Sequence, residues 1–64
     1  MKVKAVIKLI EADGWYYMNT EGSHRHFKHP VKKGRVTVAG KMNRDLPLGT
    51  TNSILRQAQL KEKK

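Results

Sequence analysis

The chain of 64 residues contains no cysteine, so neither a disulfide nor a thiolate metal site can reinforce its fold. Acidic residues are also scarce, since five Asp and Glu stand against fourteen Lys and Arg, giving a formal net charge of +9. The few carboxylates do not repeat at a spacing that indicates a paired acid–base site. The excess positive charge attracts polyanions, and nucleic acid is favoured over a membrane surface because the apolar residues are needed for the core.

Long apolar runs are missing as well. The longest stretch, residues 5–10, is interrupted by Lys8, so no membrane-spanning segment is predicted. The basic start lacks the apolar segment of a signal peptide, and we expect a cytoplasmic protein. The five glycines are dispersed and form no phosphate-binding loop or dinucleotide-binding motif. Residues 1–64 are therefore expected to form one small domain with a modest core, which a bound partner would stabilise.

Two helices are predicted from apolar residues at helical spacing. The first covers residues 2–12, with one apolar face made by Val3, Val6, Ile7 and Ile10, and the Asp13–Gly14 pair ends it. The second opens at residues 49–51, where Thr50 or Thr51 is expected to cap it, and runs to Leu60. Its apolar face is made by Thr51, Ile54, Leu55 and Ala58. Residues 61–64 are expected to be a flexible tail.

Between the helices, three short segments have the composition and alternation of strands: residues 15–20, 24–29 and 35–39. The turns between them are short, which indicates an antiparallel meander. Of the aromatic residues 15–17, at least one is expected in the core. The predicted fold is α+β with the order αβββα, in which both helices pack on one face of a three-stranded antiparallel sheet. This is a double-stranded-RNA-binding-domain-like architecture, and it leaves the other sheet face in water.

The candidate chemistry is concentrated in residues 22–29, which contain all three histidines. Strand alternation directs His24 and His26 toward the wet face together with Lys28, and Phe27 toward the core. In RNA cleavage, His24 would be the base for a 2′-hydroxyl, and Lys28, Arg25 or His26 would supply positive charge or the acid.

The residue pattern leaves other hypotheses open. His24 and His26 could chelate zinc with His29 as a third ligand, but position 29 is expected to face the other way. The histidines could also belong to a basic hairpin that binds RNA without cutting it. A subunit whose basic face serves only a protein partner is a further possibility.

Several motifs, in order over nearly the whole chain, resemble the HicA family of messenger-RNA interferase toxins. They are Leu9–Trp15, Gly22–His24 with Phe27, Lys28–Pro30, Gly49–Thr50 and Ser53–Ala58. The resemblance implies a toxin of a type II toxin–antitoxin system with a double-stranded-RNA-binding-domain-like fold. It also implies metal-independent, cofactor-free RNA cleavage that inhibits translation, with the functional histidine at His24. The implied partner is a HicB-type antitoxin that covers this site.

The chain departs from the family pattern after the third strand. Where relatives often have Val-Pro-Gly-His, it has Val38–Lys41, and a lysine cannot replace a histidine in proton transfer near pH 7. Lys41 can still hold a phosphate. The predicted site therefore has His24 as the catalytic residue and a set of RNA-binding cations: Lys28, Arg25, Lys32, Lys33 and Lys41. His26 and Ser23 are candidate assisting residues.

Overall fold

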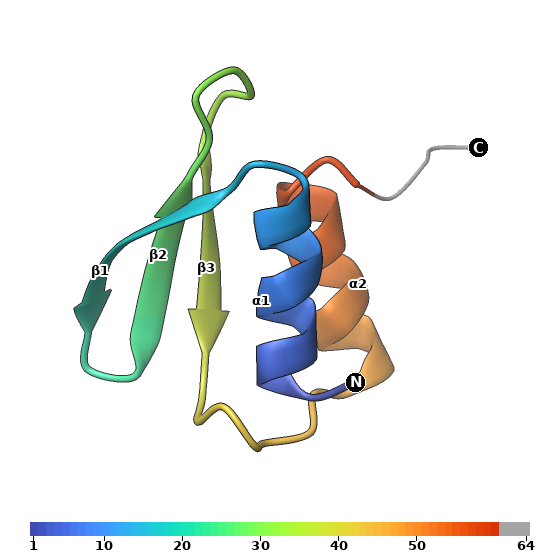
Figure 1. Ribbon diagram of the computed structural model, residues 1–64. Coiled ribbons are helices and arrows are strands. Elements are labelled where there is room, and N and C mark those ends of the chain that lie inside the picture. The colour runs from blue at the N-terminus through green and yellow to red at the C-terminus, as the bar shows by residue number, and fades with distance from the viewer. Residues whose placement is uncertain (61–64) are drawn as a thin grey trace.

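The computed structural model describes residues 1–60, and the predicted tail, residues 61–64, lies outside them. Five elements follow one another along the chain: α1 (Val3–Ala12), β1 (Tyr16–Glu21), β2 (His24–Lys28), β3 (Arg35–Ala39) and α2 (Leu48–Gln57). The predicted order αβββα is confirmed. The two helices lie side by side on one face of the sheet (Figure 1).

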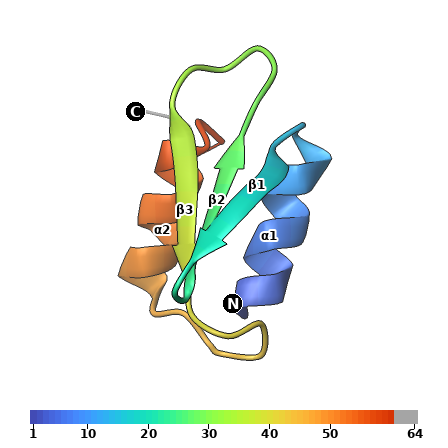
Figure 2. The same ribbon diagram turned by 90° about the vertical axis from the view of Figure 1, so that its left-hand side faces the viewer.

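The sheet has the strand order β1-β2-β3, and both neighbouring pairs are antiparallel. Figure 2 shows the face that neither helix covers, which we call the outer face. Pairing across the strands arranges its side chains in three rows: Glu21–His24–Ala39, Asn19–His26–Thr37 and Tyr16–Lys28–Arg35. His24 and Lys28 therefore lie at opposite ends of this face.

The core lies between the inner face of the sheet and the two helices. Strand alternation brings Phe27, Val36 and Val38 to this inner face, as predicted. The buried apolar residues are Val3, Val6, Ile7, Ile10, Trp15, Phe27, Val36, Val38, Leu46, Ile54 and Ala58. Trp15, in the turn between α1 and β1, closes one end of this core and donates from Nε1 to the Ala58 carbonyl at 3.2 Å.

The second helix begins earlier than predicted. It starts at Leu48 directly after Pro47, whose φ of −59° and ψ of 154° turn the chain into the helix. The predicted cap by Thr50 or Thr51 is wrong, because both residues lie inside the helix and no side chain in the described part of the chain caps it. The Thr51 hydroxyl is buried and has no hydrogen-bond partner among the described residues.

The first strand also differs from the prediction. It begins at Tyr16 rather than Trp15, because the side chain of Trp15 turns into the core. The pairing with β2 shifts between Tyr17 and Asn19, which leaves Met18 in a bulge. Tyr16, Tyr17 and Met18 are each about half exposed, so Trp15 is the only aromatic residue of this segment that enters the core.

The loop from residue 40 to residue 47 is held against the start of α1. The backbone N–H groups of Val3 and Lys4 donate to the carbonyls of Arg44 and Met42, at 2.9 and 3.0 Å. The N–H of Leu46 donates in return to the Met1 carbonyl at 2.9 Å. The first N–H groups of a helix have no partner within the helix, and no side chain of residues 1–60 caps α1. The loop therefore completes α1, and α1 fixes the position of the loop.

Candidate active site

His24 is the first residue of β2 and follows a tight hairpin turn. Glu21 pairs with His24, so only Gly22 and Ser23 form the loop between β1 and β2. Gly22 has a φ of +62° and Ser23 has no positive φ, which matches a turn with glycine at its first central position. The His24 side chain is exposed and makes no hydrogen bond or ion pair with the described residues. It is available to a ligand.

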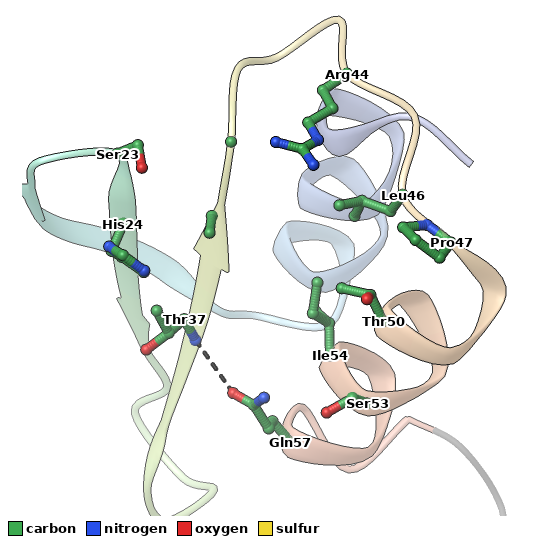
Figure 3. A pocket seen from close by; sticks show the side chains of 12 residues that line it. Ser23, His24, Thr37, Arg44, Leu46, Pro47, Thr50, Ser53, Ile54 and Gln57 are labelled. Carbon is green, nitrogen blue, oxygen red and sulfur yellow. Dashed lines mark hydrogen bonds between the residues drawn. The ribbon is translucent and has the colours of Figure 1, made fainter.

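A cleft of about 490 Å³ opens beside His24, between the edge of the sheet and α2 (Figure 3). Its lining comes from the β2 and β3 strands, the loop 40–47 and α2: Ser23, His24, Thr37, Ala39, Gly40, Arg44, Leu46, Pro47, Thr50, Ser53, Ile54 and Gln57. None of these residues is acidic. With one imidazole, one guanidinium, hydroxyls and an amide, the cleft suits a phosphorylated ligand.

His26 lies on the same face as His24, as alternation predicts, but it is engaged within the sheet. Its Nδ1 lies 3.1 Å from the Thr37 hydroxyl and its Nε2 lies 3.3 Å from a carboxylate oxygen of Glu21. In the neutral form Nε2–H donates to Glu21 and Nδ1 accepts from Thr37. The side chain is only 13% exposed and does not line the cleft.

The His29 side chain is hydrogen-bonded within the fold through both ring nitrogens. Its Nε2 donates to the Asp13 carbonyl at 2.7 Å, while Nδ1 accepts from the N–H groups of Val31 and Lys32, each at 3.0 Å. The ring also meets Trp15 edge to face, with centroids 5.2 Å apart. Both ring nitrogens are thus occupied, so His29 is not placed to join His24 and His26 around a metal. Within residues 1–60 no three histidine or carboxylate side chains converge as metal ligands.

The predicted cations do not gather around His24. Lys28 is exposed and lies four residues after His24 in β2, which places the two residues roughly 13 Å apart at the usual rise per residue of a strand. Arg25 points to the inner face, where its Nη1 donates to the Gly40 carbonyl at 2.6 Å. Lys33 is exposed in the loop between β2 and β3, whereas Lys41 is exposed directly after Gly40, beside the cleft.

Lys32 is paired with Asp13 and also donates to the Ala58 carbonyl at the end of α2, at 3.3 Å. The hydrogen bond from Lys32 holds the pKa of the Asp13 carboxyl below its ordinary value of 3.8, although partial burial opposes this shift. Together with His29, Lys32 and Asp13 connect the turn between α1 and β1, the loop between β2 and β3, and the end of α2. Lys32 therefore serves the fold in this structure.

Arg44, the guanidinium that lines the cleft, was not among the cations predicted from the sequence. Thr50, Ser53 and Gln57, which line the cleft from α2, were not predicted as site residues either. The helical spacing of positions 50, 53 and 57 could have indicated a shared helix face. Arg44 had no such signal, because its position depends on hydrogen bonds between the loop 40–47 and α1.

The α+β fold, the bare outer face and the histidine beside a cleft without acids define a double-stranded-RNA-binding-domain-like protein with a candidate polyanion site. The family described as HicA toxin of bacterial toxin–antitoxin matches residues 3–60 of the chain. The chain therefore belongs to the HicA toxin family. No curated protein matches it. Within residues 1–60, neither helix has the length and apolar character that crossing a membrane requires.

Proposed function

We propose that this protein is the toxin of a type II toxin–antitoxin system and acts as an endoribonuclease that cleaves messenger RNA with His24. Membership of the HicA toxin family supports the role of toxin. The observation that carries the enzymatic part is His24 itself, an exposed imidazole that has no partner within residues 1–60 and lines a cleft with no acidic residue. Imidazole is the side chain best suited to proton transfer near neutral pH.

In the proposed reaction, Nδ1 or Nε2 of His24 removes the proton of a ribose 2′-hydroxyl. The 2′-oxygen then attacks the adjacent phosphorus, and the bond from phosphorus to the 5′-oxygen of the next nucleotide breaks. That leaving oxygen takes up a proton, so the products are a 2′,3′-cyclic phosphate and a 5′-hydroxyl. One positioned base contributes a factor of about 10² to 10⁴ in rate, and the step needs neither a metal nor a cofactor.

The proposed protein partner is a HicB-type antitoxin that covers His24 and the cleft. The net charge of +9 favours a partner with complementary negative potential, which would speed association and compete with RNA. The proposed location of both proteins is the cytoplasm, where messenger RNA is translated.

The first test is induced expression of the wild type, His24→Ala and Arg56→Ala, with growth and messenger-RNA integrity followed in the same cultures. Arg56 is exposed on α2 outside the cleft, so its variant controls for the loss of a polar surface side chain. We expect arrest with loss of RNA for the wild type and Arg56→Ala, and neither for His24→Ala. Equal arrest by all three without RNA cleavage would instead indicate a non-catalytic RNA-binding module.

The second test uses purified protein and an RNA oligonucleotide in excess EDTA. Continued cleavage with 2′,3′-cyclic phosphate and 5′-hydroxyl ends is the expected result. A 5′-phosphate product would contradict the role of His24 as the base for the 2′-hydroxyl. Activity that EDTA abolishes would contradict the metal-independent mechanism.

A further inference from the structure

The lining of the cleft beside His24 is chemically mixed. Hydroxyl, imidazole, amide and guanidinium groups contribute polar atoms, and Ala39, Leu46, Pro47 and Ile54 contribute apolar surface. Its volume of about 490 Å³ lies in the range of pockets that enclose small ligands, typically about 300 to 1,000 Å³. An occupant with a flat apolar body and a negative group would match both the apolar surface and the polar groups of this lining.

Arg44 supplies the positive charge of this cleft, and its backbone is held in place. Its carbonyl accepts from the N–H of Val3 at 2.9 Å, and its N–H donates to the Lys41 carbonyl at 3.0 Å. Its side-chain stem passes so close to Gly40 that a Cβ on Gly40 would lie 3.1 Å from the Arg44 Cδ. Figure 3 shows the guanidinium turned from the loop toward the cleft.

The guanidinium of Arg44 has no ion pair or hydrogen bond with the other described residues, whereas Arg25 donates to Gly40 and Lys32 pairs with Asp13. Its planar set of donors matches two oxygens of a phosphate, which a lysine cannot do. It lines the same cleft as His24 from the opposite side (Figure 3). A phosphate bound by Arg44 would therefore lie in a space that His24 also borders.

Gln57 presents a polar group of fixed orientation on the α2 side. Its Oε1 accepts from the backbone N–H of Thr37 at 3.2 Å, as the dashed line in Figure 3 marks. Because a backbone N–H requires an acceptor, this bond fixes which end of the amide faces β3. The Nε2 group, a donor only, has no acceptor within residues 1–60 and would select an acceptor on an occupant.

We propose that this cleft binds one unpaired nucleotide of the RNA substrate, in which Arg44 holds the scissile phosphate and Gln57 donates to an acceptor on the base edge. The base lies against the apolar surface that Leu46, Pro47 and Ile54 contribute from the loop and α2. A base in this cleft cannot remain paired in a duplex, so the substrate is a single-stranded segment. This inference rests on the proposed ribonuclease function and names the substrate form and two further binding residues.

Binding is tested first, without cleavage. The ¹⁵N-labelled full chain carrying His24→Ala is titrated with each of the four nucleoside 3′-monophosphates and followed by NMR. We expect amide shifts at cleft residues such as Gly40, Thr50 and Ser53. Adding Arg44→Gln should weaken binding about tenfold or more, while the charge-matched control Arg56→Gln should not. Shifts confined to Lys28 and Arg35 on the outer face, or equal effects of both substitutions, would overturn the proposal.

Cleavage is tested with one RNA oligonucleotide, either free or annealed to its complement. We expect the free strand to be cut and the duplex to resist. Arg44→Gln should lower kcat/KM about 10²-fold, with Arg44→Lys in between. Gln57→Ala should alter the base preference next to the cut, whereas Gln59→Ala, outside the cleft, should leave it unchanged. Preferential cleavage of the duplex would refute the nucleotide subsite.

The two tests separate the failures of the two proposals. If the wild type cuts neither form but the NMR shifts depend on Arg44, the ribonuclease function fails and the nucleotide site stands. If the wild type cuts RNA but Arg44→Gln and Arg56→Gln behave alike in both assays, the ribonuclease function stands and the subsite is wrong.

Discussion

The same substitution at two histidines is expected to affect different properties: His24→Ala should lower activity, whereas His29→Ala should lower stability. His24 is exposed and makes no side-chain bond among the described residues, so its removal should change the free energy of unfolding by less than about 0.5 kcal/mol. His29 is 9% exposed and makes three hydrogen bonds. The stability cost and the loss of activity should therefore fall on different variants.

The cost at His29 follows from its contacts. Water can replace the bonds to the Val31 and Lys32 N–H groups, because both residues are at least partly exposed. The bond to the Asp13 carbonyl and the edge-to-face contact with Trp15 contribute about 1 kcal/mol each, and lost packing of the ring adds to this. The sum is about 2–3 kcal/mol, out of roughly 3–10 kcal/mol for a chain of this length.

Urea unfolding measures this difference. Trp15 is the single tryptophan and is buried, so its fluorescence reports unfolding of the core. Because His29 contacts the Trp15 ring, circular dichroism is recorded as a second probe of unfolding that does not depend on this contact. With an m-value of about 1 kcal/mol per M, the midpoint of His29→Ala should fall by roughly 2 M, and that of His24→Ala should hardly move. Equal midpoints for the two variants would refute the structural role of His29.

Three further predictions concern stability. Because Lys32 lowers the pKa of Asp13, the ionised carboxylate stabilises the fold above pH 3.8, and this contribution is lost as the pH falls through the lower pKa of the folded state. Asp13→Asn should therefore abolish this part of the acid sensitivity, which urea midpoints measured between pH 6 and pH 3 would show. Gly40 has a φ of +103° and lies against the Arg44 side chain, so Gly40→Ala should lower the free energy of unfolding by about 1–2 kcal/mol and reduce RNA cleavage. An unchanged Tm and an unchanged cleavage rate would contradict this close packing. Thr51→Val replaces a buried hydroxyl, which has no partner within residues 1–60, by a methyl of similar size and should raise the free energy of unfolding by about 1 kcal/mol. A lower Tm would indicate that the hydroxyl makes a hydrogen bond.

The element order was predictable because each segment carries its own periodicity. The apolar positions of α1 recur at helical spacing, and alternation in β2 correctly directed His24 outward and Phe27 inward. The same alternation turns Arg25 inward, where it donates to Gly40. Its proposed closeness to His24 came from adjacency in the sequence, which does not imply a shared face.

The rest of the site depends on contacts between distant segments. Lys32 reaches Asp13 only because the loop between β2 and β3 folds back onto the first turn. Arg44 lines the cleft because an irregular loop binds the start of α1. Neither contact leaves a periodic pattern in the sequence. The beginning of α2 differs for a local reason, since the helix begins at Leu48, directly after Pro47 and before the threonines that were expected to cap it.

The attachment of the loop 40–47 to α1 has a thermodynamic consequence. Val3 and Lys4 would lose these hydrogen-bond acceptors if the loop left α1, so displacement of the loop and fraying of the first turn of α1 are expected to be coupled. A ligand that binds only the closed loop must then protect the whole chain from unfolding by RT ln(1 + [L]/Kd), which is about 2.7 kcal/mol at a hundredfold excess over Kd. For so small a domain, occupation of the cleft by a ligand would be a major determinant of its lifetime in the cell.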